Sequence, residues 1–417
     1  MRKQLENGIN LTVIENSQFK TNRIVINFVA PLAGEESAER MLLANLLEIS
    51  SAKYPSQQKL AEKLSELYGA SFGITVSKKG NYHLISLILN GVNDKFLEHK
   101  TDSLKEIFNF IKEIIFNPNV TDGHFDEETF KRQKENLMMS IRSISDDKQS
   151  YAGLELQKLY FQNDQAIPSY GTIEAIEKIT ATSLFEYYKQ MLATNRVDIF
   201  VIGELDEIET ESIVKILPFT PRDFEMVPIF YHQDVKEVVT KVETQAVAQG
   251  KLNMAYQLPV YYREDGYYAG LIFNGIFGGS PLAKLFVNVR EKASLAYYAS
   301  SSLDTFRGIL TVQTGIESQN KDKVIEIVQQ QLDDIIAGDI SDELLNKTKM
   351  TMINQYQSSL DSQMALINQS MVDQLTQTEV GTTEWIDGIN AVDKSAVQAV
   401  AREVKLQAIF FLNGEIK

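Results

Sequence analysis

The sequence predicts an α+β protein built from two homologous α/β halves. Short runs rich in β-branched residues alternate with long helical patterns along the whole chain. Residues of the first half recur in the second half at a constant spacing, and a proline-containing segment without helical periodicity separates the two. A chain of 417 residues is also too long for one ordinary core. We therefore expect an N-terminal half at 1–217, a linker at 218–240 and a C-terminal half at 241–417.

The first half opens with two predicted strands and two predicted helices. The strands, at 10–14 and 23–28, are short runs rich in Val and Ile. The first helix is predicted at 36–50. A second helix starts after Ser56, a favourable N-cap residue, and places Leu60, Leu64 and Leu67 on one face.

A strand pair, further helices and a closing strand complete the first half. The strand pair is predicted at 74–77 and 83–89, with a turn around Gly80. Val197–Ile202 has the continuous apolar character of a buried strand. Helical patterns fill the region between them, at about 94–116 and 123–143 and then through 150–192.

The second half repeats the first at a measurable spacing. The register shifts from an offset of 228 to an offset of 215 after a deletion. Convergent patterning of two α/β halves is the alternative, but a collinear series with matching element types favours duplication. The pairs are Leu67/Leu295, Lys79/Arg307, Gly80/Gly308, Asp94/Asp322, Lys95/Lys323, Leu104/Leu332, Ile107/Ile335, Phe108/Ile336 and then Lys131/Asn346, Arg132/Lys347, Lys134/Lys349, Leu137/Met352.

Composition excludes several classes of function. The net charge of −15 argues against a nucleic-acid partner bound through its phosphates. The absence of cysteine excludes disulfides, thiolate metal sites and cysteine nucleophiles. The N-terminus has no apolar segment typical of a signal peptide, and no run is long enough to span a membrane, so we expect a cytoplasmic protein. Metal or base chemistry must use carboxylates or the four histidines, His83, His99, His124 and His232.

The most informative stretch lies in the second half, from Gly275 to Tyr297. Its glycines do not match a phosphate-binding loop, since neither a Walker lysine nor a Gly-x-Gly-x-x-Gly pattern is present, and close packing beside a helix is the simpler interpretation. The stretch resembles the pitrilysin/insulinase metallopeptidases (inverzincins), and the resemblance extends over nearly the whole chain. The matching residues are Gly278, Gly279, Ser280, Leu285, Phe286, Arg290, Glu291, Lys292, Leu295, Ala296 and Tyr297.

The resemblance implies a fold and two substrate-binding residues. In that family the two halves, each similar to those of the mitochondrial processing peptidase, form a clam-like chamber. Residues at the positions of Arg290 and Tyr297 contact the substrate there. Seven residues apart on a continuous helix, the two side chains would share a face. A surface ion pair and a half-buried aromatic ring are the alternative interpretation.

The resemblance also implies a zinc cofactor, but the motif that binds it is missing. The family motif His-x-x-Glu-His belongs on the first helix, and Tyr54-Pro55 anchors the alignment. In that register Met41, Ala44 and Asn45 replace the first His, the Glu and the second His. A shifted register retains Glu48 but places Asn45 and Ile49 at the two histidine positions.

The third metal ligand of the family, a Glu on a later helix, is also absent. Ser140 stands at its position, Gln133 stands at the position of its acidic neighbour, and Glu135 is predicted to lie on a solvated face. The segment from Lys95 to His99 mimics the motif, but a lysine ammonium has no lone pair for zinc. We therefore expect no metal and no catalytic residue in this chain.

These observations predict a non-catalytic member of the family, with an active enzyme as the alternative. We expect it to bind extended peptide as an added strand, along an edge at 71–77, and to complete the chamber of an active zinc-peptidase sibling. Self-association is the other expected form of assembly. An active zinc endopeptidase and a scaffold that binds folded protein but no peptide are the alternatives.

Overall fold

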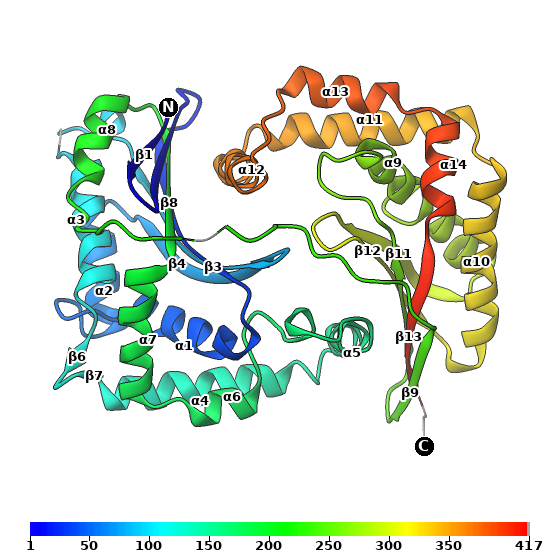
Figure 1. Cartoon of the computed structure of the whole chain (residues 1–417), viewed down its shortest axis with the longest axis horizontal. Helices are drawn as coiled ribbons and strands as arrows, with labels where there is room; N and C mark the ends of the chain where they lie inside the picture. The colour runs from blue at the N-terminus through cyan, green and yellow to red at the C-terminus, as the bar shows by residue number, and fades with distance from the viewer. Residues whose placement is uncertain (100, 225, 415–417) are drawn as a thin grey trace. The chain divides into compact units, whose positions relative to one another are not determined.

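The computed structural model describes residues 1–99, 101–224 and 226–414, which divide into two compact units (Figure 1). Unit 1 comprises 1–142, 167–227 and 362–372, and unit 2 comprises the rest. The chain passes from unit 1 to unit 2 after residue 227, a position inside the predicted linker. Two segments depart from the predicted halves, because 143–166 packs within unit 2 and 362–372 packs within unit 1.

Unit 1 contains a six-stranded sheet in the order β1-β2-β8-β3-β5-β4. Strands β2 and β8 are parallel, and all other neighbours are antiparallel. Strand β4 forms one edge of the sheet. The strands are β1 (Arg2–Glu6), β2 (Ile9–Glu15), β3 (Thr21–Pro31), β4 (Ser71–Lys79), β5 (Tyr82–Val92) and β8 (Arg196–Gly203).

Unit 2 contains a five-stranded sheet in the order β11-β12-β10-β13-β9. Here β9 and β13 are parallel and the remaining pairs antiparallel. The strands are β9 (Val239–Gln245), β10 (Gly250–Gln257), β11 (Ala296–Asp304), β12 (Ile309–Ile316) and β13 (Lys405–Gly414).

The two sheets have the same topology, which supports the duplication predicted from the sequence. Strands β4, β5, β3, β8 and β2 of unit 1 correspond in order and direction to β11, β12, β10, β13 and β9 of unit 2. Gly80 and Gly308, paired at the offset of 228, occupy corresponding hairpin turns in the two units, with φ values of 54° and 59°. Glycine meets the left-handed conformation of this turn without strain. Strand β1 has no counterpart in the described part of unit 2.

The helices that unit 1 takes from the first half of the sequence pack on one face of its sheet. Ser56 caps the second helix by accepting a hydrogen bond from the backbone of Lys59, as predicted. The helix expected over 94–116 begins only at Ser103, after a short 3-10 turn, and the pattern through 150–192 is broken at Pro168 and Gly171. The helices are α1 (Ser37–Ile49), α2 (Gln57–Glu66), α3 (Ser103–Phe116), α4 (Glu127–Ser143), α6 (Ile173–Lys178), α7 (Ala181–Thr194) and α8 (Glu207–Val214); a two-stranded hairpin, β6 (Val120–Thr121) and β7 (His124–Phe125), precedes α4.

Unit 2 has a helical layer on one face of its sheet and a single helix on the other. The single helix, α5 (Lys148–Tyr160), lies on the opposite face, where Ala152 and Leu156 pack against Phe410 and Leu412 of β13. The layer contains α9 (Tyr267–Phe277), α10 (Lys321–Ala337), α11 (Asp342–Ser359), α13 (Thr382–Ala391) and α14 (Lys394–Arg402).

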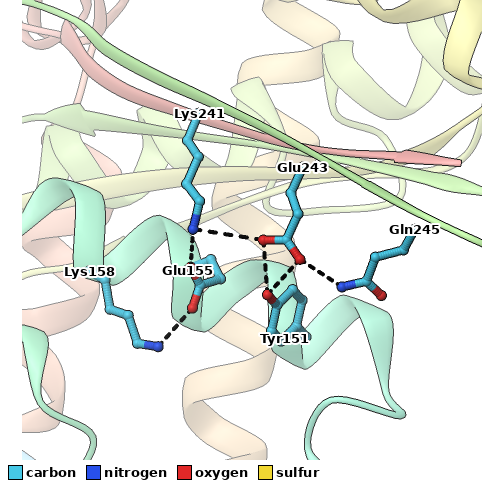
Figure 2. Close-up of polar contacts among 6 residues, drawn as sticks. All are labelled: Tyr151, Glu155, Lys158, Lys241, Glu243 and Gln245. Carbon is cyan, nitrogen blue, oxygen red and sulfur yellow. Dashed lines mark hydrogen bonds and ion pairs between the residues drawn. The ribbon is translucent and has the colours of Figure 1, made fainter.

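A polar cluster fastens α5 to the edge strand β9 (Figure 2). The Tyr151 hydroxyl donates to the Glu243 carboxylate at 2.8 Å, and Lys241 donates to Glu155 at 2.7 Å. Burial acts to raise the pKa of Glu155, but hydrogen bonds from Lys158 and Lys241 outweigh it and hold the pKa below its usual value. The polar groups of this cluster are paired with one another, so we assign it a structural role.

Residues 362–372, from the second half of the sequence, cover the sheet of unit 1 on the face opposite its other helices, as α5 does in unit 2. Helix α12 (Gln363–Thr376) begins there, and Ile367 is fully buried against Val25, Phe200 and Ile202 of β3 and β8. The Gln363 amide donates to the Thr21 carbonyl at 2.7 Å. Each sheet is therefore covered on this face by a helix encoded in the other half of the sequence.

The first helix of unit 1 is held in place by a fully buried arginine. Arg40 of α1 is only 1% exposed and donates to the carbonyls of Phe28 and His83, on β3 and β5, at 2.8 and 2.9 Å. It also donates to the Asn195 side chain at 2.8 Å and the Tyr187 hydroxyl at 3.1 Å. One guanidinium thus joins α1 to two strands and to α7.

Replacing Arg40 is expected to destabilise the protein strongly. Arg40→Met leaves four buried acceptors without their donor, and we expect a loss of at least about 3 kcal/mol in the free energy of unfolding. The measurement is urea denaturation followed by circular dichroism. Arg132→Met, at an exposed position of α4, is the control and should change the value by less than about 0.5 kcal/mol. Equal effects of the two substitutions would show that Arg40 is not a structural anchor.

His83 should make stability depend on pH. Burial, together with the positive charges of Arg40 and Lys78, lowers the pKa of this fully buried side chain to about 3. The unfolded chain binds a proton near pH 6.5, whereas the folded chain does not until about pH 3. The contribution of His83 to the free energy of unfolding is therefore fully present above pH 6.5. As the pH falls below 6.5, this contribution decreases by about 1.4 kcal/mol per pH unit.

Unfolding free energies measured between pH 7 and 4 test this expectation. The slope should become shallower in His83→Gln, because the variant has no imidazole to protonate on unfolding. His99→Gln, at an exposed position, should retain the slope of the parent chain. An unchanged slope in His83→Gln would mean that His83 is protonated in the folded protein as readily as in the unfolded chain.

Candidate functional site

A small pocket of about 310 Å³ lies between α1 and α4 in unit 1. The outward face of α1 supplies one side of the pocket and α4 supplies the other. Helix α1 is held there by the buried side chains of its opposite face, among them Leu43, Leu46 and Leu47. The pocket is lined by Met41, Asn45, Glu48, Ile49, Gln133, Asn136, Leu137 and Ser140.

The structure brings together most of the positions that correspond to the metal-binding motif. Met41 and Asn45, four residues apart on α1, line the pocket together with Ser140 of α4. Ala44, at the position of the general base, is fully buried and does not line the pocket. Glu48 and Ile49, from the shifted register, also line it. Asn136 was not singled out by sequence reasoning, because an exposed helical asparagine carries no signal of its own.

The side chains at these positions do not fit a zinc ion. A thioether, a carboxamide and a hydroxyl replace the two imidazoles and the carboxylate that a catalytic zinc site of this type requires. Within the described parts of the chain, no group of three or more His, Cys, Asp or Glu side chains is arranged to hold a metal ion. We therefore derive no chemistry through a metal at this pocket.

The four histidines lie apart from the pocket. His83 is buried in β5, and His99 is exposed. His124 of β7 lies 3.9 Å from the Glu127 carboxylate, and His232 packs against the ring of Tyr261. The segment that mimics the motif is not a helix, since Lys95 belongs to a short 3-10 turn and pairs with Glu204 at 2.5 Å.

Among the residues that the structure describes, Glu48 is the only carboxylate that lines the pocket. It points toward β4, where the backbone N–H of Ile74 hydrogen-bonds to it. Its Oε1 lies 3.8 Å from the position that a Cβ would occupy on Gly73. Burial raises the pKa of Glu48, and the hydrogen bond from Ile74 opposes this shift only in part.

The edge strand β4 passes beside this pocket. It pairs with β5 on one side and, as the last strand of the sheet, has no strand on its other side among the described residues. Ser71, Thr75 and Ser77 are exposed, whereas Ile74 is buried, which is the alternation of a half-buried strand. An edge strand can bind another extended segment through its outward backbone groups, although the Ile74 N–H is already engaged by Glu48.

Arg290 and Tyr297 lie in unit 2 on two different elements. Arg290 belongs to the short π-helix Phe286–Lys292, where its guanidinium stacks over the Phe286 ring at 4.6 Å. The helix ends before Tyr297, so the condition under which the two side chains would share a helix face is not met. Ser294, with φ of 54°, reverses the chain, and Tyr297 then falls at a β-bulge in β11.

The bulge explains the exposure of Tyr297. Ala296 and Tyr298 pair with adjacent residues of β12, which leaves Tyr297 as the extra residue. A bulge redirects a side chain out of the regular pleat, and Tyr297 is 66% exposed. Both proposed substrate residues therefore present their side chains on the surface of unit 2.

The glycines before this helix serve close packing. Gly278 is the C-cap of α9, so the cluster follows a helix and does not open one. A Cβ on Gly278 would lie 2.6 Å from the backbone nitrogen of Ser301 in β11. The structure thus supports the packing interpretation of the glycine-rich stretch.

None of the described helices combines the length and the apolar character that crossing a membrane requires.

A family model described as "Peptidase M16 inactive domain" matches residues 178–352. The curated protein "Probable inactive metalloprotease YmfF" of Bacillus subtilis (strain 168) is 30% identical over 414 residues, which cover 99% of this chain and 97% of that protein.

Solved structures agree over the full length of the chain. A conserved protein from Enterococcus faecalis V583 shares 47% identity at a TM-score of 0.96, covering 100% of this chain and 99% of that one. A peptidase M16 inactive domain from Pseudomonas fluorescens, at 17% identity, has the same fold with a TM-score of 0.81, over 99% of this chain and 98% of that one. Together with the missing zinc ligands, these matches show that the chain belongs to the M16 peptidase family, as a homologue of its inactive members.

Proposed function

We propose that this chain binds extended peptide and completes the substrate chamber of an active M16 peptidase, without catalysing cleavage itself. The observation that carries the proposal is the position of an unpaired sheet edge, β4, beside a pocket whose residues do not fit zinc. Peptide would add as a further strand to β4. Arg290 and Tyr297, both exposed, are proposed as additional substrate contacts from unit 2.

Loss of catalysis follows from the chemistry of the pocket. In the family's motif a zinc ion and a glutamate together activate a water molecule. Ala44 at the glutamate position has no group that accepts a proton, and it is fully buried. Met41, Asn45 and Ser140 supply no imidazole or carboxylate. An active zinc endopeptidase would need ligands that this site does not have.

Pairing with a catalytic sibling gives such a chain a role in peptide hydrolysis. The proposed partner is an active peptidase subunit, with self-association as the other form of assembly, and the proposed location is the cytoplasm. A scaffold that binds folded protein but no peptide is the competing function. Binding of extended peptide distinguishes the two.

Restoring the missing ligands tests whether the pocket is a degenerate metal site. The variant Met41→His/Asn45→His/Ser140→Glu should bind one zinc ion per chain, because all three positions line one pocket and residues 41 and 45 share a helix face. The parent chain should bind none. Zinc content after gel filtration, measured by inductively coupled plasma mass spectrometry, gives the stoichiometry.

A matched control places the glutamate one residue earlier. Met139 is exposed on α4 and does not line the pocket, so Met41→His/Asn45→His/Met139→Glu should bind zinc at least about tenfold more weakly. Equal affinities of the two triple variants would contradict the proposed ligand positions. Stoichiometric zinc and peptidase activity in the parent chain would overturn the proposal that it is inactive.

Strand addition makes a specific prediction about the peptide backbone. Alternate amides of an added strand point toward the sheet edge, and the others point to solvent. Two versions of one extended peptide, N-methylated at odd or at even positions, should therefore differ at least about tenfold in affinity. Fluorescence anisotropy with the labelled peptides measures this. Equal weakening by both methylation patterns would argue against a strand, and failure of the unmethylated peptide to bind would favour the scaffold.

A further inference from the structure

The pocket between α1 and α4 contains a carboxylate without a cation. Glu48 is half-buried, and the lining includes the carboxamides of Asn45, Gln133 and Asn136 and the hydroxyl of Ser140 but no lysine or arginine. No ion pair of Glu48 is found among the described residues. Its carboxylate faces β4, near Gly73 and the backbone N–H of Ile74.

Two carboxylates with little exposed side-chain area are paired, whereas Glu39, whose pKa burial also raises, resembles Glu48 in having no ion pair among the described residues. Glu155 accepts from Lys158 and Lys241, and Glu211 accepts from Lys3 and Lys215, each at 2.7 Å. Burying a carboxylate without a counter-charge is unfavourable, and an incoming cation reverses that cost. Consistent with this, burial raises the pKa of Glu48, whereas the pKa values of Glu155 and Glu211 are lowered.

The remaining lining groups can accept hydrogen bonds from a cationic ligand. Asn45, Gln133, Asn136 and Ser140 each carry an acceptor oxygen beside their own donors, so the charge of Glu48 is what favours a cation. A lysine ammonium carries three donors and an arginine guanidinium five, and neither accepts a hydrogen bond. A pocket of about 310 Å³ is large enough for one such side chain and too small for a folded domain.

Because the pocket lies beside β4, a peptide bound along this strand can place a basic side chain in the pocket. Glu48 contacts β4 at Ile74 and approaches Gly73. A strand added to β4 would lie about 4.8 Å away, so a long side chain projecting from it can reach the pocket. A free amine or metal ion would not use this proximity.

We propose that the pocket formed by Asn45, Glu48, Gln133, Asn136 and Ser140 binds a lysine or arginine side chain of a peptide lying along β4. This inference rests on the proposed strand addition and adds its specificity. The site that corresponds to the metal centre of the family would thus have become a site for a basic side chain. Glu48 supplies the charge, and the carboxamides supply further acceptors.

The test compares peptides that differ in one side chain. Labelled extended peptides with lysine, arginine, norleucine or acetyl-lysine at one central position are titrated against the full chain by fluorescence anisotropy. Lysine or arginine should bind about tenfold more tightly than norleucine or acetyl-lysine, as expected for a charge-assisted contact. In Glu48→Gln this preference should fall to less than about twofold.

Glu135→Gln is the matched control, because Glu135 is an exposed carboxylate on α4 that does not line the pocket. It removes the same charge and should retain the full preference. Gln133→Glu, which adds a second carboxylate to the lining, should increase the preference. This variant also provides a test that does not depend on Glu48→Gln folding normally, which thermal denaturation checks.

The possible outcomes distinguish failure of the basic-side-chain site from failure of the proposed strand addition. If all peptides bind but lysine and norleucine bind equally, the basic-side-chain site is wrong and strand addition stands. If Glu135→Gln abolishes the preference as fully as Glu48→Gln, the effect is long-range charge and not the pocket. If no peptide binds, the proposed function fails, and this inference fails with it.

Discussion

The buried guanidinium of Arg40 is the interaction on which the geometry of unit 1 depends. A helix packed on a sheet by apolar side chains alone can slide or rotate at moderate cost, since the hydrophobic effect is not directional. Arg40 removes that freedom, because its donors meet acceptors on β3, β5 and α7 simultaneously. The residues next to it on α1 are thereby fixed in orientation: Ala44 faces the core, while Met41, Asn45 and Glu48 face the pocket.

Local signals in the sequence predicted much of the fold, whereas the exchange of helices between the halves was not predictable. Ser56 and Gly80 act through their own backbone neighbourhoods, so their roles can be recognised from a few residues. The apolar stripe of α5 shows that the helix is partly buried but does not specify which sheet it covers. That choice depends on Phe410 and Leu412 of β13, more than 200 residues further along the chain.

The candidate site was only partly accessible to the same reasoning. Met41, Asn45 and Ser140 could be placed because a motif with fixed spacing on regular helices predicts which residues converge. Tyr297 could not be placed, because the end of a π-helix and a β-bulge interrupt the regular spacing on which the prediction relied. Asn136 and the orientation of Glu48 toward β4 emerge only from tertiary packing.

The architecture also explains how a metal site can be lost while the fold remains. A structural zinc contributes folding energy, so its ligands cannot be replaced without cost. Here the positions equivalent to the ligands lie on helices whose stability comes from elsewhere: Leu43 and Leu47 bury the inner face of α1, and Arg40 fixes its orientation. Met41 packs only at the margin of this core, and Asn45 and Ser140 are polar side chains outside its apolar cluster, so these positions can change at less cost than those of the inner face. Glu48 lies at that face without an ion pair among the described residues, and the proposed basic side chain would supply its counter-charge.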